Sequence, residues 1–132
     1  MNRLDYFKAR LDAQIAPVDV LRALRTSPGR LYVIDVRNGP AEVLGERIPG
    51  ARQIPQNVIL EHVGELPKDR QIVLYCWDVW CSLAAEAAVP LLERGFDVRE
   101  MAGGIKAWQT LRFPTEPVDG RALAGQMPPL PQ

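Results

Sequence analysis

The chain has 132 residues, 47% of them hydrophobic and 24% charged, a composition typical of a single globular domain. Its 16 basic and 16 acidic residues give a formal net charge of +0, which argues against nucleic acid or a membrane surface as a partner. No apolar stretch reaches transmembrane length, and the charged N-terminus lacks the apolar core of a signal peptide. We therefore expect a cytoplasmic protein.

The cysteine and histidine content argues against three further classes: secreted disulfide scaffolds, thioredoxin-like redox proteins and Cys/His zinc proteins. The two cysteines, Cys76 and Cys81, lie in one short segment, whereas a secreted scaffold distributes its cysteines to tie distant elements together. Four residues separate them, two more than in a thioredoxin-like motif. The single histidine, His62, is expected on the surface of a helix. The chain thus lacks the ligands of the usual Cys/His zinc site, and no metal or organic cofactor is expected.

Hydrophobic periodicity predicts helices and strands along the chain. Residues 2–13 show a weak amphipathic pattern, and Pro17 is well placed to open a second helix. The apolar stripe of the first helix has two interpretations, packing against the helices of the sheet or a contact in a homodimer. The further expected elements are strands at 31–34, 52–54, 71–75 and 97–101, and helices at 41–44, 56–65, 83–94 (closed by Gly95) and 105–109.

The strands predicted at 31–34 and 71–75 are largely apolar, as strands buried on both faces are. Apolar strands that alternate with helices predict an α/β fold with a central parallel sheet covered by helices on both faces. We expect an N-terminal helical extension over residues 1–16, one domain over residues 17–118, and a disordered Pro-rich tail over residues 119–132.

Cys76 follows the second of these strands and precedes a short loop and an alanine-rich helix. Ligands of open α/β sheets bind beyond the carboxyl ends of the strands, which is where Cys76 stands. The amides that open a helix have no intrahelical partner, and a loop above them can aim further N–H groups inward as an anion-binding nest. Such an environment favours the thiolate, so Cys76 is predicted to be a nucleophile rather than a packing residue.

Four blocks of the sequence, in order, resemble the single-domain rhodaneses, a family of sulfurtransferases. The blocks are Asp35-Val36-Arg37; Arg47-Ile48-Pro49-Gly50-Ala51 with Ile54-Pro55; Tyr75-Cys76 with the loop and helix that follow; and Gly95-Phe96 with Met101-Ala102-Gly103-Gly104 and Trp108. The resemblance spans residues 17–118. It implies a rhodanese-like sandwich in which a cysteine, here Cys76, takes up a sulfane sulfur as a persulfide and passes it to a thiophilic acceptor.

The resemblance also implies the residues of the site. The loop whose backbone amides would hold the persulfide comprises Trp77, Asp78, Val79, Trp80, Cys81 and Ser82, and the supporting residues would be Asp35, Arg37 and Arg47. Related phosphatases have a loop one residue longer that ends in arginine. Ser82 stands at that position, which disfavours phosphate-ester hydrolysis. The expected partners are a small sulfur donor or a protein persulfide, and a thiol acceptor.

The chain departs from the common family pattern in two places. Arg47 replaces the histidine before Ile-Pro-Gly-Ala, and the loop has Val79 and Cys81 where glycine and arginine are common. The loop resembles instead a subset that closes with a second cysteine. Because Asp78 lies in the loop, and no Lys or Arg occurs from Cys76 through Cys81, thiosulfate, a dianion, is expected to be a poor donor.

The second cysteine and the two tryptophans of the loop can each be interpreted in two ways. Cys81 either packs at the start of the helix or is a second redox thiol that attacks sulfur on Cys76, which requires Cα atoms within about 7 Å. Trp77 and Trp80 are either scaffold or, for at least one of them, an exposed wall of the acceptor site.

The remaining residues are expected to have mainly structural roles. Asp35 and Arg37 are expected to join a buried polar network beside the strand end. Arg47 either pairs with Asp35 or another carboxylate, or faces an anionic substrate. Ser82 is expected to cap the helix or to line the loop, and Trp108 is expected in the core.

The sequence therefore predicts a sulfurtransferase, with two alternatives. One is a non-catalytic binding module that keeps the fold and uses the tryptophans of the loop as an interaction surface. The other is a redox sensor in which Cys76 and Cys81 form a reversible pair.

Overall fold

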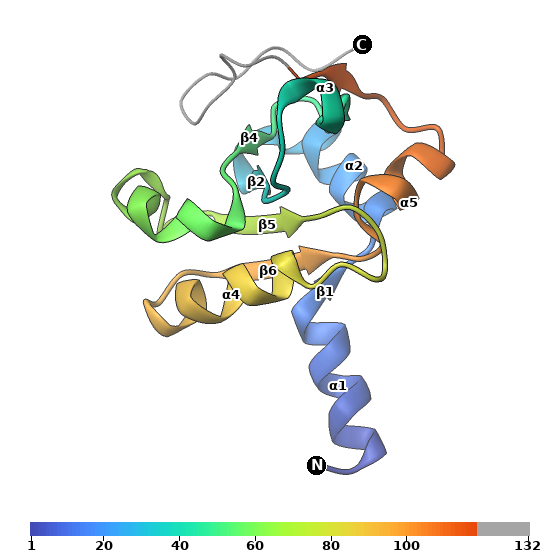
Figure 1. The fold of residues 1–132 in the computed structure, drawn as a ribbon. Coiled ribbons are helices and arrows are strands. Elements are labelled where there is room, and N and C mark those ends of the chain that lie inside the picture. Colours follow the sequence, from blue (N-terminus) through green and yellow to red (C-terminus); the bar gives the residue numbers. More distant parts are fainter. Residues whose placement is uncertain (119–132) are drawn as a thin grey trace.

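A parallel sheet forms the centre of the protein, whose structure is a computed structural model that describes residues 1–118. The tail predicted over residues 119–132 lies outside the described residues. The strands of the sheet are β1 (Gln14–Ile15), β2 (Leu31–Asp35), β4 (Arg52–Gln53), β5 (Gln71–Tyr75) and β6 (Val98–Met101). In the described part of the chain these five strands lie in the order β1-β6-β5-β2-β4, and every neighbouring pair is parallel (Figure 1).

Helices cover both faces of this sheet, because its two central strands are apolar on both sides. Ile34 and Leu74 belong to one buried cluster, whereas Val33 and Val73, one residue earlier in each strand, belong to the other. The first cluster lies under α4 (Leu83–Glu93) and the 3-10 helix η2 (Gln56–Glu65), and the second under α2 (Pro17–Thr26) and α5 (Gly104–Thr110). The predicted α/β sandwich with a parallel sheet is confirmed.

The short elements differ from the sequence prediction. β1 was not predicted, because a strand of two residues shows no periodicity and forms here by pairing with β6. An antiparallel pair of β3 (Glu46–Arg47) and β7 (Glu116–Pro117) was missed for the same reason. Residues 56–65 are helical as predicted, but they form 3-10 turns rather than an α-helix. The remaining elements are η1 (Pro28–Arg30) and α3 (Ala41–Leu44).

The N-terminal helix α1 (Arg3–Ala13) extends away from the rest of the fold (Figure 1). None of its residues is buried, and Leu4, Phe7 and Leu11 are exposed. The interpretation that its apolar stripe packs against the helices of the sheet is therefore wrong. The homodimer contact stays a prediction.

A buried ion pair occupies the carboxyl end of β2. Asp35 and Arg37 are 0% and 1% exposed, and Nη2 of Arg37 lies 2.7 Å from Oδ2 of Asp35. Nε of Arg37 donates to Oδ1 of the same carboxylate at 2.9 Å, so the contact is bidentate. The guanidinium also donates to the carbonyl oxygens of Leu44 and Glu46. The predicted buried polar network is confirmed, and it ties β2 to the segment around β3.

Tyr75, the last residue of β5, extends this network. Its hydroxyl donates to Oδ2 of Asp35 at 3.1 Å and accepts the amide of Ile48 at 3.1 Å. Burial, and then the negative charge of Asp35, raise the pKa of Tyr75 well above its ordinary value, so the phenol stays neutral and keeps its donor proton. The ends of β2 and β5 are thus joined immediately before Cys76.

Substitution of Asp35 by alanine should be strongly destabilising. Asp35→Ala leaves the Arg37 guanidinium charged, buried and without its carboxylate, which should lower the free energy of unfolding by about 3–5 kcal/mol. Asp19→Ala is the matched control, because it removes an exposed pair with Arg22 and should cost less than about 1 kcal/mol. Urea unfolding of the two variants measures the difference. Equal losses would contradict the role assigned to the buried pair.

Candidate active site

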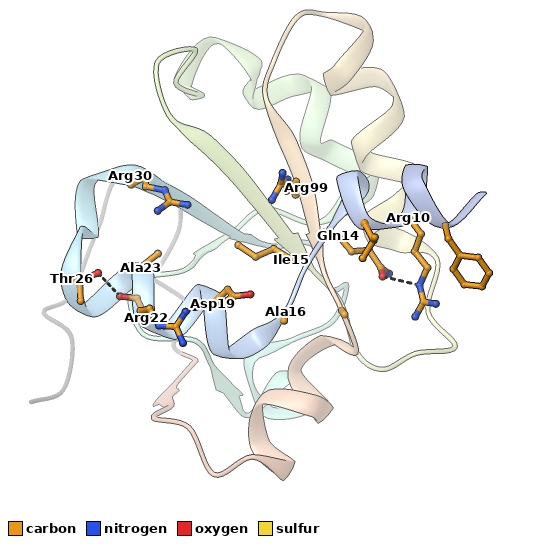
Figure 2. Close-up of a pocket in the computed structure, with 13 residues that line it drawn as sticks. Arg10, Gln14, Ile15, Ala16, Asp19, Arg22, Ala23, Thr26, Arg30 and Arg99 are labelled. Carbon is orange, nitrogen blue, oxygen red and sulfur yellow. Dashed lines mark hydrogen bonds and ion pairs between the residues drawn. The ribbon is translucent and has the colours of Figure 1, made fainter. Parts of the chain in front are cut away.

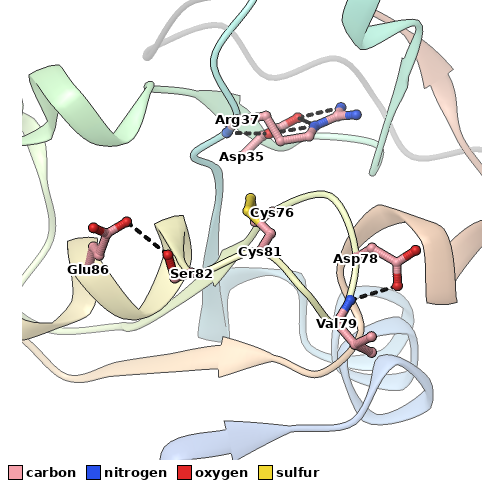
Figure 3. Close-up of a disulfide and its surroundings, with 8 residues drawn as sticks. All are labelled: Asp35, Arg37, Cys76, Asp78, Val79, Cys81, Ser82 and Glu86. Carbon is pink, nitrogen blue, oxygen red and sulfur yellow. Dashed lines mark hydrogen bonds and ion pairs between the residues drawn. A yellow bond between two sulfur atoms is a disulfide. The ribbon is translucent and has the colours of Figure 1, made fainter.

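The two cysteines close the loop between β5 and α4. Cys76 follows Tyr75 at the carboxyl end of β5 and is 3% exposed, and Cys81 lies two residues before α4. Their sulfur atoms form a disulfide, with the Cα atoms 6.3 Å apart (Figure 3). The distance requirement for a redox pair is therefore met, and the structure represents the oxidised form of the loop.

The start of α5 determines the path of this loop. The amides of Ile105 and Lys106 donate to the carbonyl oxygens of Cys76 and Trp77 at 2.9 and 3.0 Å. In a planar trans peptide the N–H points opposite to the C=O. The amides of Trp77 and Asp78 are therefore directed away from α5.

Only part of the predicted amide nest is available in the disulfide form. The amide of Val79 donates to Oδ1 of Asp78, and the amide of Cys81 donates to the carbonyl oxygen of Asp78. Among residues 1–118, the other loop amides have no hydrogen-bond partner; they are those of Trp77, Asp78, Trp80 and Ser82. These four amides are the donors with which the loop can hold an anion.

Gly104 permits the close contact between α5 and the loop. Its φ is +63°, and a Cβ atom there would lie 2.7 Å from the carbonyl oxygen of Cys76 and 2.8 Å from the amide nitrogen of Asp78. Both neighbours are backbone atoms, which cannot turn aside as a side chain can. Glycine is thus required at this position for two separate reasons.

The tryptophans have different environments. Trp77 is partly buried, and the Arg37 guanidinium lies 4.6 Å from its ring centroid, so it connects the loop to the polar network. Trp80 is 70% exposed, and its neighbour Val79 is 83% exposed. One tryptophan of the loop is therefore exposed, as predicted. Trp108 is 0% exposed, which confirms its assignment to the core.

The partners of Arg47 and Ser82 decide between their alternative interpretations: pairing of Arg47 with a carboxylate other than Asp35 is confirmed. Nε of Arg47 lies 2.8 Å from Oε1 of Glu116, so this buried arginine pairs with a carboxylate of β7 rather than with Asp35. Ser82 immediately precedes α4 but makes no capping bond through its side chain. Its hydroxyl donates instead to Oε2 of Glu86 at 3.2 Å. The predicted cap by the Ser82 side chain is wrong.

A cavity of about 330 Å³ adjoins the loop. It brings together both cysteines with three polar residues that the sequence analysis missed, Arg10, Gln14 and Glu100. No local pattern identifies these three, because the pairing of β1 with β6 places them beside the loop. The other lining residues are Asp78, Val79, Ala85, Met101, Ala102, Gly103 and Gly104. The predicted residues Asp35, Arg37, Arg47 and Ser82 do not line it.

Glu100 is the half-buried carboxyl group of this cavity. Desolvation raises its pKa above the ordinary value, and a hydrogen bond from Gln14 opposes the shift. Oε1 of Gln14 in turn accepts Nε–H of Arg10 at 3.3 Å. Polar groups of α1 and β1 therefore line the same cavity as a carboxyl group and the two cysteines.

A larger cavity, of about 710 Å³, lies where α1, α2 and β6 meet (Figure 2). It is lined by four arginines and by Asp19, which pairs with one of them, Arg22. None of the described residues that line it is a cysteine or a histidine. The smaller cavity is the candidate active site, because both cysteines line it.

Residues 1–118, which the structure describes, contain neither a metal-ligand cluster nor a helix that could span a membrane. In this part of the chain, no group of three His, Cys, Asp or Glu side chains is arranged to hold a metal ion. No helix described there is both long enough and apolar enough to span a bilayer.

Substitution of Gly104 by alanine should displace the loop. Gly45→Ala is the matched control, since Gly45 has φ +69° but no neighbour within 4 Å of a Cβ position. Gly45, with φ +69° and ψ −87°, lies in a backbone region that L residues rarely adopt, so the control should lose about 1–3 kcal/mol of unfolding free energy from this conformation alone. Gly104→Ala should lose a further 1–3 kcal/mol, approximately, because backbone atoms must move. Denaturant unfolding measures both variants, and equal losses would contradict the close contact.

Comparison with known proteins agrees with the fold. The model of the rhodanese-like domain family matches residues 17–111. A sulfurtransferase from Allochromatium vinosum is 34% identical over 91 residues, which are 68% of this chain and 82% of that protein. An HTH-type transcriptional regulator from Mycobacterium tuberculosis is 30% identical over 102 residues, 77% of this chain but 44% of the regulator.

The solved structures give the same result. The crystal structure of a full-length protein from Lactobacillus plantarum has a TM-score of 0.84 and 30% sequence identity, and the match covers 88% of this chain and 97% of that one. Since the family model covers most of the chain and the relatives share its fold, the protein belongs to the rhodanese-like domain family, with an active-site loop closed by two cysteines.

Proposed function

We propose that the protein is a sulfurtransferase that carries a sulfane sulfur as a persulfide on Cys76. The observation that supports this most directly is the position of Cys76 at the carboxyl end of β5, on a loop that leaves four amides without partners. Membership in the rhodanese-like family and a relative named as a sulfurtransferase support the same function.

The proposed reaction has two displacement steps. The Cys76 thiolate attacks the sulfane sulfur of a donor, and the donor leaves with the electron pair of the broken bond. The product is a persulfide anion on Cys76, which the loop amides stabilise as preorganised dipoles. A thiolate of the acceptor then attacks the outer sulfur, and the Cys76 thiolate is regenerated.

The charges in the cavity favour some donors over others. Arg10 is the one basic residue among the described residues that line it, whereas Asp78 and Glu100 are both acidic. A dianion such as thiosulfate is therefore a poor donor, and a neutral small donor or a protein persulfide is a better one. Trp80 and Val79, two exposed residues of the loop, offer an apolar surface to a thiol acceptor.

The disulfide favours a second function, redox sensing by the pair. The Cys81 thiolate can attack the inner sulfur of a Cys76 persulfide and release hydrosulfide, leaving the Cys76–Cys81 disulfide. In the cytoplasm, the location predicted from the sequence, thiol reductants would reopen this bond. A non-catalytic binding module, the third alternative, needs only the exposed apolar surface of the loop.

The test of the main proposal is substitution of Cys76. The protein is reduced first, then incubated with thiosulfate or with a neutral persulfide, and its intact mass is measured. Cys76→Ser should take up no sulfur and should lose turnover to the background rate, because the nucleophile is gone. Circular dichroism checks its fold. Wild-type turnover by Cys76→Ser would exclude the assignment, and a wild-type protein that takes up no sulfur would favour the binding module.

Substitution of Cys81 tests the redox function. Cys81→Ala should retain sulfur uptake, and its persulfide should live about tenfold longer or more, because an intramolecular attack has a high effective molarity. Peptide mapping without reductant should find the Cys76–Cys81 crosslink in the oxidised wild type. If no crosslink forms and the persulfide decays equally fast in both proteins, Cys81 is a packing residue.

A further inference from the structure

Glu100 lies on the same face of the sheet as Cys76. In the register of the sheet Glu100 is paired with Leu74 of β5, and paired residues of parallel strands point to the same side. Cys76 follows Leu74 by two residues, and both belong to the buried cluster that also contains Val98, two residues before Glu100. From strand spacing and rise, Glu100 and Cys76 are neighbours about 8 Å apart at Cα, within reach of a glutamate side chain.

Two polar residues of the N-terminal extension lie beside Glu100. Gln14 of β1 is paired with Glu100 in the register, so its side chain is on this face too. Its carbonyl oxygen accepts from Arg10, and both residues line the cavity together with Glu100. The N-terminal extension thus places two polar groups beside a carboxyl group that shares a cavity with the cysteines.

The cavity contains few other groups that can exchange a proton. Apart from the cysteines and Glu100, the titratable residues that line it within the described part of the chain are Arg10 and Asp78. Asp78 accepts the amide of Val79, and α4 contributes only Ala85 to the lining. Glu86 of α4 bonds Ser82 and does not line the cavity. The desolvation that raises the pKa of Glu100 suits it to both accept and release a proton.

We propose that Glu100 transfers the proton in the reaction between the two cysteines. Glu100 takes the proton from the Cys81 thiol, and the Cys81 thiolate attacks Sγ of the Cys76 persulfide. A disulfide bond forms, the bond between the two persulfide sulfurs breaks, and its electron pair leaves with the outer sulfur. That sulfur receives the proton from Glu100 and departs as hydrosulfide. The outer sulfur gains one electron, the Cys81 sulfur loses one, and the oxidation state of Cys76 Sγ is unchanged, because it exchanges one sulfur–sulfur bond for another.

This inference rests on the proposed function for its persulfide, but the same proton transfer is required when a thiol reductant reopens the disulfide. There a dithiothreitol thiolate attacks Sγ of Cys76, and Cys81 leaves as a thiolate that takes its proton from Glu100. The second thiol of dithiothreitol then attacks the mixed disulfide, closes the cyclic disulfide of the reagent and releases Cys76 as a thiolate. The reopening reaction therefore examines Glu100 without any sulfur donor.

The first experiment uses Glu100→Gln, with Glu93→Gln on the exposed end of α4 as the control. Each reduced protein is loaded with a neutral persulfide donor, and the rates of hydrosulfide release and disulfide formation are followed by intact mass from acidic to alkaline pH. In the wild type the rate should rise as Glu100 ionises and then level off. Glu100→Gln should be about a hundredfold slower near neutral pH and should rise only as the Cys81 thiol ionises.

Sulfur uptake and reopening of the disulfide, measured together, separate failure of the proposed function from failure of the proposed proton transfer. Reopening of the disulfide by dithiothreitol should also be slower in Glu100→Gln. If the wild type takes up no sulfur but reopening depends on Glu100, the proposed function is rejected and the proton transfer is retained. Normal uptake with Glu100-independent rates in both reactions overturns the proton transfer alone.

A merely structural role of Glu100 is tested in the Cys81→Ala background. There the thiol that would give its proton to Glu100 is absent, so adding Glu100→Gln should leave the persulfide lifetime unchanged. A change of the same size as in the wild-type background would overturn the proposal, because the effect would not act through Cys81.

Discussion

The contact between the start of α5 and the loop after β5 is the constraint on which the site depends. Two amides of α5 hold the carbonyl oxygens of Cys76 and Trp77, and Gly104 lets the two backbones approach to a distance that no side chain would allow. With the carbonyl oxygens held on this side, the amides of the same peptides point the other way. The contact therefore turns an ordinary connection between strand and helix into a surface that can receive an anion.

The buried network behind the loop supports this arrangement from the opposite side. Asp35, Arg37 and Tyr75 join the carboxyl ends of the two central strands, and Arg37 also lies over the ring of Trp77. A buried ion pair costs desolvation, and here every part of it has a hydrogen-bonding partner. These residues do not line the cavity of the cysteines, so their contribution is to position the loop rather than to contact a substrate.

The edge of the sheet adds a third component to the site. β1 has two residues, yet its pairing with β6 brings Gln14 beside Glu100, and Arg10 of the preceding helix lies within reach. The cavity thus combines the cysteine pair with a carboxyl group whose environment is set by a segment far from it in sequence. The acidic character of the lining and the second cysteine distinguish this loop from one that would bind a small dianion through a cation.

The order of the residues was enough to predict the class of fold and the strand end at which Cys76 lies. Both are local properties: apolar strands such as residues 71–75 and the change from strand to helix around Cys76 are visible in the order of the residues. It also predicted that Trp108 lies in the core and that Asp35 and Arg37 join a buried polar network. That the sulfurs of Cys76 and Cys81 meet could be seen only in the folded protein, because it depends on the curvature of the loop. The fold also brings Arg10, Gln14 and Glu100 to the cavity. Arg10 and Gln14 precede the loop by about 60 residues or more in the sequence, and Glu100 follows it by about 20, so only strand pairing across the sheet places them together.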